Sequence, residues 1–158
     1  MSVFYWVSSS QPPIPKLGEF QEIHNLHLSQ SPFYDASGQS FQLSDFKGKL
    51  IILHSFASWC APCIEEIPEM INFYKKVKDK NVVLIAVQRE PLRDKIDMPG
   101  LPVYFDPGNK LVQEMNLIAG VPSTLFISPS GKAQLIVLGK ALWESDTMHQ
   151  KIEELLKK

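Results

Sequence analysis

The two cysteines of this 158-residue chain, Cys60 and Cys63, constrain its fold more than any other feature. They are separated by two residues and lie between the apolar run 50–56 and a stretch with helical periodicity. The apolar run is typical of a buried strand, so the pair sits at a strand-to-helix turn. Unpaired backbone N–H groups at the start of a helix stabilise a thiolate on the first cysteine. The pattern therefore indicates a redox pair in an α/β protein.

The two thiols are expected to differ in role because they differ in depth. A thiolate, and not a thiol, attacks a disulfide, so Cys60 at the helix start is the predicted nucleophile. Pro62 suits the first helical turn, where the N–H that proline lacks has no partner in any case. Cys63 lies one turn further into the helix and should be shielded. It therefore suits the resolving role, in which it breaks the mixed disulfide and leaves a Cys60–Cys63 bridge.

Other uses of the pair stay open at this point. A purely structural disulfide closing so short a loop stabilises a fold by only about 2 kcal/mol in the chain-entropy model. A zinc site needs two further ligands, and no histidine of the chain has zinc-finger or zinc-ribbon spacing relative to the cysteines. A copper-binding module that uses both thiols and a histidine is the main alternative function. A non-catalytic adaptor with vestigial thiols is another.

Two further motifs support a family resemblance. Trp59-Cys60-Ala61-Pro62-Cys63, followed far downstream by Gly120-Val121-Pro122-Ser123-Thr124, resembles the thioredoxin superfamily. The pattern Cys-x-x-Cys-x-x-Glu-x-Pro and the lead-in Leu43-Ser44-Asp45-Phe46-Lys47-Gly48-Lys49 resemble its TlpA-like thiol-disulfide oxidoreductases. That branch includes the ResA and CcmG (DsbE) proteins of cytochrome c maturation. The resemblance implies a thioredoxin fold, which is a central mixed β-sheet flanked by helices, with an N-terminal β-hairpin extension.

The resemblance also implies an activity. It is thiol-disulfide exchange with no cofactor other than the redox-active disulfide, carried out by a reductase on the extracytoplasmic (periplasmic) side. Its substrates would be protein thiols and disulfides, including apocytochrome c thiols, and a membrane thiol-transfer protein would recharge it. A monomer is expected. A peroxiredoxin shares this sheet but needs Thr or Ser three residues before its reactive cysteine, and Ala57 occupies that place.

The predicted substrate-binding residues are Trp59, Pro62, Val121 and Pro122. Family members have a cis peptide bond before the proline that matches Pro122, which spacing alone would not predict. Such a bond would turn the backbone of Val121 toward the cysteines, where it could pair with an extended substrate peptide. Trp59 would cover one side of the Cys60 sulfur and contact substrates, or else pack against the sheet.

Glu66 is a predicted catalytic residue beside the cysteines. It matches the Glu of the family pattern and lies three residues past Cys63, on a neighbouring part of the same helix face. If it is partly buried, it could accept or return the Cys63 proton near neutral pH. The alternative is that Glu65, Glu66 and Glu69 form a solvated acidic face.

His54 is a second predicted catalytic residue, and it departs from the family pattern. Thioredoxins carry a buried Asp at this strand position. Alternation places His54 on the same strand face as Ile52 and Phe56. A buried imidazole there could relay a proton to or from Cys63 or pair with Glu66; the alternative is a core histidine whose hydrogen bonds are satisfied.

Composition and hydropathy indicate one globular domain, residues 17–158, after a tail of residues 1–16. The chain is 44% hydrophobic and carries a formal net charge of −1, which gives no reason to expect nucleic-acid binding. No apolar run is long enough to span a bilayer. The aromatic cluster Val3-Phe4-Tyr5-Trp6-Val7 before a Ser/Pro-rich stretch suggests the remnant of a membrane anchor upstream of residue 1. An ordinary tail is the alternative.

The remaining elements are predicted from periodicity. Residues 21–28 and 41–43 are expected to form the arms of the N-terminal hairpin region, with a turn at 35–39. Strands are expected at 50–56, 82–87 and 103–105, and as a hairpin at 124–128 and 133–138. Helices are expected at 61–78, 109–116 and 142–156, with a single helical turn at 44–46 and no long helix between 88 and 102. The expected inner faces are Ile64, Ile67, Ile71 and Tyr74 for the first helix, and Met148, Ile152 and Leu155 or Leu156 for the last.

Overall fold

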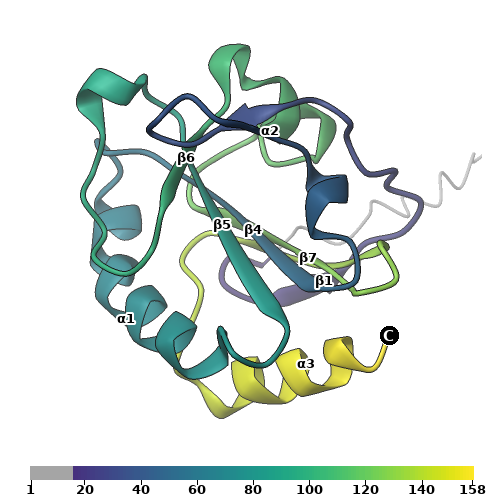
Figure 1. Ribbon diagram of the computed structural model, residues 1–158. Coiled ribbons are helices and arrows are strands. Elements are labelled where there is room, and N and C mark those ends of the chain that lie inside the picture. The colour runs from purple at the N-terminus through teal and green to yellow at the C-terminus, as the bar shows by residue number, and fades with distance from the viewer. Residues whose placement is uncertain (1–15) are drawn as a thin grey trace, which may run out of the picture.

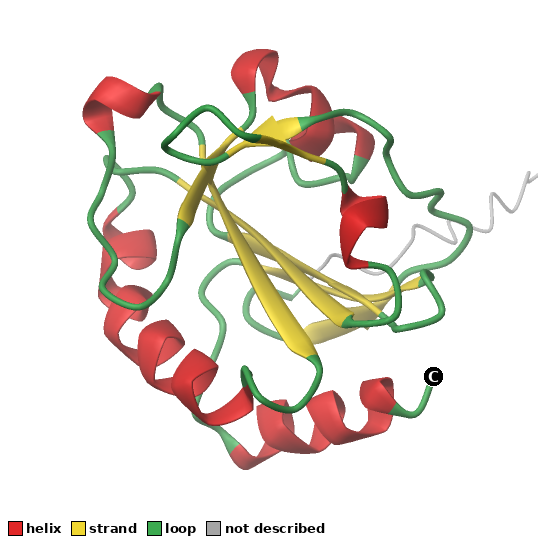
Figure 2. Ribbon diagram, viewed as in Figure 1, coloured by secondary structure: helices red, strands yellow, loops and turns green. Residues whose placement is uncertain are grey.

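The computed structural model describes residues 16–158 and contains a mixed sheet of eight strands in this range (Figures 1 and 2). The strand order is β1-β8-β7-β4-β5-β6-β2-β3. The strands are β1 (Phe20–Glu22), β2 (Phe33–Tyr34), β3 (Ser40–Phe41), β4 (Leu50–Phe56), β5 (Val82–Gln88), β6 (Val103–Phe105), β7 (Ser123–Ile127) and β8 (Ala133–Leu138). The predicted central mixed sheet is confirmed. The aromatic cluster predicted near the N-terminus lies outside the described residues.

The centre of the sheet is the parallel pair β4 and β5. Every residue of β4 is buried, and Leu50 to Phe56 lie opposite Val82 to Gln88. A strand covered on both faces needs apolar residues on both, so its sequence shows a continuous run instead of alternation. The helix α1 (Ala61–Val77) connects the two strands, which confirms the predicted strand–helix–strand unit.

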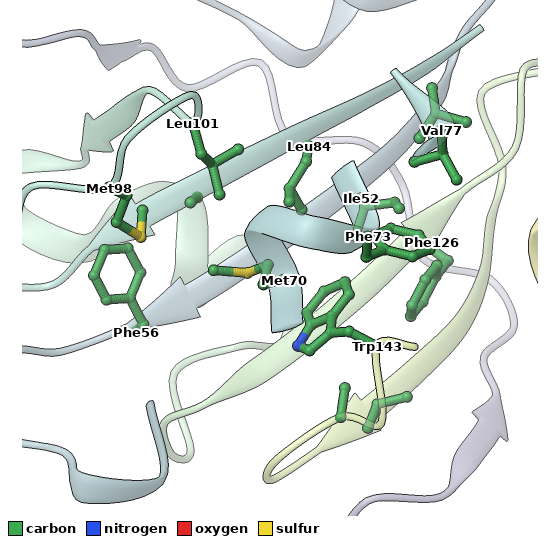
Figure 3. Packing of buried hydrophobic residues seen from close by; sticks show 14 of the residues in the cluster. Ile52, Phe56, Met70, Phe73, Val77, Leu84, Met98, Leu101, Phe126 and Trp143 are labelled. Atoms are coloured by element: carbon green, nitrogen blue, oxygen red, sulfur yellow. The ribbon is translucent and has the colours of Figure 1, made fainter. Parts of the chain in front are cut away.

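Helices cover both faces of the sheet (Figure 1). The helices α1 and α3 (Asp146–Leu156) pack on one face, and the short helix α2 (Lys110–Glu114) and the 3₁₀ turn Leu43–Phe46 pack on the other. The cluster between the sheet and the helices α1 and α3 contains large side chains, among them Phe56, Met70, Phe73, Phe126 and Trp143 (Figure 3). It also contains both cysteines. The redox pair is therefore embedded in the edge of the larger core.

The inner face of α1 differs from the predicted one. Its buried residues are Cys63, Glu66, Met70, Phe73 and Val77, whereas Ile64 is 43% exposed. The other three predicted residues, Ile67, Ile71 and Tyr74, are only half-buried at the margin of the core. The prediction of the inner face followed the spacing of the isoleucines. The helix is instead rotated so that Cys63 and Glu66 face the sheet.

The predicted N-terminal hairpin is present, but its first arm was wrong, and its second arm overlaps the observed strand at Phe41 alone. The hairpin consists of β2 and β3, which pair around the confirmed turn at 35–39 and add to the sheet next to β6. The strand β1 pairs instead with β8 at the opposite edge, with Phe20 opposite Val137. Residues 21 and 41 therefore lie on opposite edges of the sheet, a long-range arrangement that local sequence patterns do not specify.

The C-terminal half follows the prediction with shifted boundaries. The hairpin of β7 and β8 is confirmed, and β7 pairs antiparallel with β4. The last helix begins at Asp146, four residues later than predicted, because the Ser145 side chain caps it by accepting from the Met148 N–H. Its buried residues Met148, Ile152 and Leu155 are as predicted. Between 88 and 102 there is only a 3₁₀ turn, Leu92–Asp94. Within residues 16–158, no helix combines the length and apolar character needed to cross a membrane.

Candidate active site

Cys60 and Cys63 form a disulfide at the start of α1, with their Cα atoms 5.2 Å apart. Cys60 is the N-cap residue of the helix, and its sulfur accepts from the backbone N–H of Cys63 at 3.3 Å. The sulfur therefore lies where the unpaired N–H groups of the helix stabilise negative charge. Cys60 keeps 5% of its surface exposed, whereas Cys63 is fully buried. This order of exposure matches the predicted nucleophilic and resolving roles.

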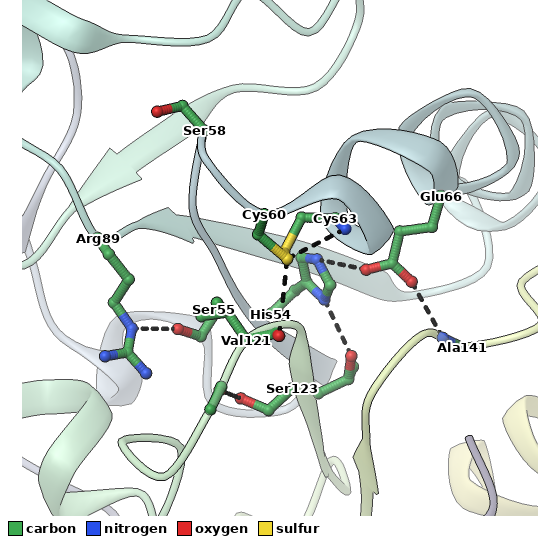
Figure 4. The surroundings of a disulfide bond; sticks show 12 residues. His54, Ser55, Ser58, Cys60, Cys63, Glu66, Arg89, Val121, Ser123 and Ala141 are labelled. Carbon is green, nitrogen blue, oxygen red and sulfur yellow. Dashed lines mark hydrogen bonds and ion pairs between the residues drawn. A yellow bond between two sulfur atoms is a disulfide. The ribbon is translucent and has the colours of Figure 1, made fainter. Parts of the chain in front are cut away.

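The peptide bond between Val121 and Pro122 is cis, as the resemblance implied. The Val121 carbonyl oxygen lies 3.6 Å from the Cys60 sulfur (Figure 4). The bond directly precedes β7, whose first residue, Ser123, lies opposite Ser55 near the end of β4. Pairing of these two strands therefore brings the backbone of Val121 beside the cysteines, although the two segments are far apart in the sequence.

A groove of about 590 Å³ runs beside the disulfide. Three of the predicted substrate-binding residues, Pro62, Val121 and Pro122, line it together with Leu17, Gly18, Glu65, Ala119, Gly120, Leu138, Gly139 and Lys140. The fourth, Trp59, does not line the groove. It is 73% exposed next to Cys60, so the alternative that it packs against the sheet is wrong. The structure therefore places all four residues around the cysteines, with an apolar surface open to solvent.

The Glu66 carboxylate is fully buried, one helical turn after Cys63 on α1. Its Oε2 atom accepts a hydrogen bond from the Ala141 backbone N–H at 3.0 Å (Figure 4). It also accepts one from the Trp143 Nε1–H at 3.0 Å. The alternative that Glu66 belongs to a solvated acidic face is therefore wrong. The sequence gives no signal for Ala141 and Trp143 as partners of Glu66, because they lie 75 and 77 positions further along the chain.

The His54 imidazole faces Glu66 from β4. Its Nε2 atom lies 3.2 Å from Glu66 Oε1, although the alignment of the ring N–H falls short of a good hydrogen bond. Its Nδ1 atom is 2.9 Å from the Thr124 hydroxyl oxygen on β7. The ring packs against Phe56 and the edge of Trp143. His54 is thus both a core histidine with one partner and a neighbour of the buried carboxylate, as one of the predictions proposed.

A second carboxylate fixes the segment before Cys60. The Ser58 hydroxyl and backbone N–H both donate to Oε1 of Glu90, which lies in the loop after β5. Burial opposes the charge of Glu90, but the hydrogen bonds from Ser58 and from nearby backbone groups outweigh it and hold its pKa below the usual value. The sequence gives no signal for this contact, because it joins two loops at the ends of neighbouring strands. Among residues 16–158, no cluster of three or more His, Cys, Asp and Glu side chains is arranged to hold a metal ion.

Comparison with known proteins agrees with this geometry. Residues 21–136 match the model of the AhpC/TSA family. The chain is 31% identical over 130 residues to the thiol-disulfide oxidoreductase ResA of Bacillus thuringiensis subsp. konkukian, a match that covers 78% of this chain and 71% of that protein. It is 32% identical over 111 residues to ResA of Bacillus subtilis, covering 66% of this chain and 62% of that one.

Solved structures show the same fold. The exposed lipoprotein thioredoxin Etrx1 of Streptococcus pneumoniae superposes with a TM-score of 0.68 at 26% identity, over 80% of this chain and all of that one (100%). A Chlorobium tepidum structure assigned to the thiol:disulfide interchange protein DsbE superposes with a TM-score of 0.70 at 26% identity, over 82% of this chain and 99% of that one. These similarities confirm the predicted thioredoxin fold and the predicted TlpA-like resemblance. The chain therefore belongs to the AhpC/TSA family and is, within it, a thiol-disulfide oxidoreductase of the ResA type.

Proposed function

We propose that this protein reduces disulfides of other proteins outside the cytoplasm, with Cys60 as the nucleophile and Cys63 as the resolving thiol. One observation carries the proposal. The Cys60 sulfur caps the start of α1 while it lies against the Val121 carbonyl at the side of an open groove. A sulfur in this position is stabilised as a thiolate and can be reached by a disulfide held in an extended segment.

In the proposed reaction the reduced protein transfers two electrons to its substrate. The Cys60 thiolate attacks one sulfur of the substrate disulfide, which breaks that bond and forms a mixed disulfide; the leaving sulfur takes up a proton. Cys63 then loses its proton and attacks the Cys60 sulfur. This step closes the Cys60–Cys63 disulfide and releases the second substrate thiol. A dithiol of another protein must reduce the bridge before the next cycle.

Glu66 and His54 are proposed to move the Cys63 proton. Cys63, Glu66 and His54 are all fully buried on the same side of the sheet, where water has little access to the inner thiol. Glu66 is anchored through Oε2 by two N–H donors, so Oε1 is the oxygen left to exchange a proton with its neighbour His54 at 3.2 Å. The buried pair would accept the proton as Cys63 becomes a thiolate and return it when the bridge is reduced.

The remaining features of the proposal concern location and partners. Etrx1 is described as an exposed lipoprotein, and relatives named ResA belong to the branch that the sequence resembles, which supports an extracytoplasmic site of action. By the same resemblance we propose a role in cytochrome c maturation and a membrane thiol-transfer protein as the electron donor. The protein is proposed to act as a monomer with no cofactor. A peroxidase role is not supported, because the position that needs Thr or Ser is the buried Ala57.

The proposal is tested by trapping a substrate. Cys63→Ser should accumulate a mixed disulfide between Cys60 and a disulfide-containing peptide, because the resolving thiol is missing. Cys60→Ser should form no mixed disulfide, because it lacks the nucleophile. Wild-type protein should accelerate insulin reduction by dithiothreitol, and neither variant should. A redox potential nearer to about −270 mV than to about −120 mV would agree with a reductase. If Cys60 in the fully reduced protein resists alkylation at neutral pH, the proposed mechanism is wrong.

A further inference from the structure

Arg89 joins three segments at the end of the sheet that carries the disulfide. It directly follows β5, and its backbone N–H donates to the Phe56 carbonyl at the end of β4, at 2.9 Å. Its side-chain Nε donates to the Ser55 hydroxyl oxygen at 2.7 Å (Figure 4). Its Nη2 atom donates to the Leu117 carbonyl at 2.5 Å. One side chain thus connects the strand that leads to the cysteines with the loop that follows α2.

The Leu117 carbonyl belongs to the segment 117–121, which ends at the cis peptide bond. Ser123 Oγ lies within hydrogen-bonding distance of the carbonyl oxygens of Leu117 and Gly120, at 3.3 and 3.1 Å. Arg89 and Ser123 therefore both donate hydrogen bonds to carbonyl groups of this segment. The segment is held by its backbone immediately before Val121, whose own carbonyl lies 3.6 Å from the Cys60 sulfur.

The guanidinium of Arg89 is half-buried, and its hydrogen-bond acceptors are neutral oxygens. Burial lowers the pKa of Arg89, and the charge of the Asp106 carboxylate acts in the opposite direction. Among residues 16–158, no carboxylate lies within 4.0 Å of the guanidinium, so hydrogen bonds to neutral oxygens take the place of an ion pair. A half-buried cation is costly unless its donors are used, and the planar fork of arginine suits two acceptors on different segments.

We propose that Arg89 is a positioning residue that sets the Val121 backbone for pairing with an extended substrate chain. The inference rests on the proposed function, because it names how that site selects its substrates. The reduction of a disulfide within a peptide would depend on Arg89, because the peptide backbone pairs with the backbone of Val121. A small disulfide without a peptide backbone would react at Cys60 with little dependence on Arg89. The residue therefore favours protein disulfides over small ones.

The test compares two substrates in the full chain. Arg89→Met keeps the length of the side chain but removes its donors, and should raise KM for a disulfide-containing peptide by about tenfold, the effect of losing hydrogen bonds from a charged donor. The rate with hydroxyethyl disulfide should change by less than about twofold. Arg89→Lys keeps the positive charge but not the planar fork of donors, so its KM for the peptide should fall between those of the wild type and Arg89→Met. The matched control is Arg93→Met, which alters an exposed arginine four residues further on and should leave both substrates unaffected.

The outcomes separate this inference from the function on which it rests. If wild-type protein reduces hydroxyethyl disulfide but not the peptide, the proposed function fails. If wild-type protein reduces both and Arg89→Met keeps the wild-type KM for the peptide, or slows both substrates equally, the inference about Arg89 is overturned. Should Arg89→Met fail to fold by circular dichroism, Ser123→Ala removes the second donor to the same segment. It should then raise KM for the peptide selectively, and an unchanged KM would equally overturn the inference.

Discussion

His54 and Glu66 present one unsatisfied atom each to the other across 3.2 Å of the buried core. Both side chains are fully buried, and the imidazole is next to Glu66 from α1, the Thr124 hydroxyl from β7, and the rings of Phe56 and Trp143. Of these groups, Glu66 carries an ionisable side chain. Two ionisable groups in a low-dielectric site interact strongly through their charges. Removal of one partner leaves any charge on the other without a compensating group.

We predict that His54→Ala changes the pH dependence of thiol exchange. If the imidazole exchanges protons with Glu66 during the reaction, the rate profile of the variant should differ in shape from that of the wild type when both are measured from about pH 5 to pH 8. The measurement is the rate of peptide disulfide reduction across this range. His24→Ala is the control, because that histidine is highly exposed. An unchanged profile for His54→Ala would leave the residue with a packing role alone.

At the scale of elements, the helix α1 determines what the site contains. The sequence correctly predicted its span and the position of Cys60 at its start, because the apolar strand before it and the proline in its first turn are local signals. It did not predict which face is buried. The isoleucines at 64, 67 and 71 form an equally regular stripe, and only packing against β4 and α3 selects the stripe that contains Cys63 and Glu66.

A pair of substitutions on α1 tests this choice of face. Met70→Ala removes a fully buried side chain and should lower the free energy of unfolding by about 2–5 kcal/mol. Ile64→Ala alters a side chain that is 43% exposed and should cost less than about 1 kcal/mol. Urea unfolding of both variants gives the comparison. Equal losses, or a larger loss for Ile64→Ala, would mean that the helix is rotated as the isoleucine spacing predicted.

The sequence also predicted the order of elements around the site better than their long-range contacts. The cysteines, the proline before β7 and Glu66 were found because each belongs to a short motif. The hydrogen bonds of Glu66 to Ala141 and Trp143, and of Glu90 to Ser58, join residues between 32 and 77 positions apart. Such contacts depend on how the strands are ordered in the sheet, so no local pattern records them.

At the scale of the whole molecule, several carboxylates favour the folded state through their charge. Hydrogen bonds from Ser37 lower the pKa of Asp35, and those from Ser29 and Ser31 lower the pKa of Glu114. Hydrogen bonds at Ser58 lower that of Glu90 despite its partial burial. A carboxyl group whose pKa is lowered by folding stabilises the protein above its unfolded pKa. This stabilisation is lost as the pH falls through the lower folded value, so the protein should become less stable below about pH 4.5.

We predict that Glu90→Gln reduces this acid sensitivity. The variant should be less stable than wild type at about pH 7, and the difference should shrink as the pH falls through the lowered pKa of Glu90, because the wild-type carboxylate then loses its charge as well. Urea midpoints at a series of pH values measure it. Glu65→Gln, an exposed position on α1, serves as the control. A difference that stays constant with pH would show that the charge of Glu90 does not contribute.

The pairing of β1 with β8 has a consequence for how the chain is made. Phe20 lies opposite Val137, so the earliest described strand has its partner near the end of the chain. On a ribosome, which releases the polypeptide from its N-terminus, residues 20–22 emerge long before the strand they join has been synthesised. The hairpin β2–β3 likewise emerges before β6, the strand with which β2 pairs. Both outer edges of the sheet must therefore be completed late in biosynthesis, after the central strands have been translated.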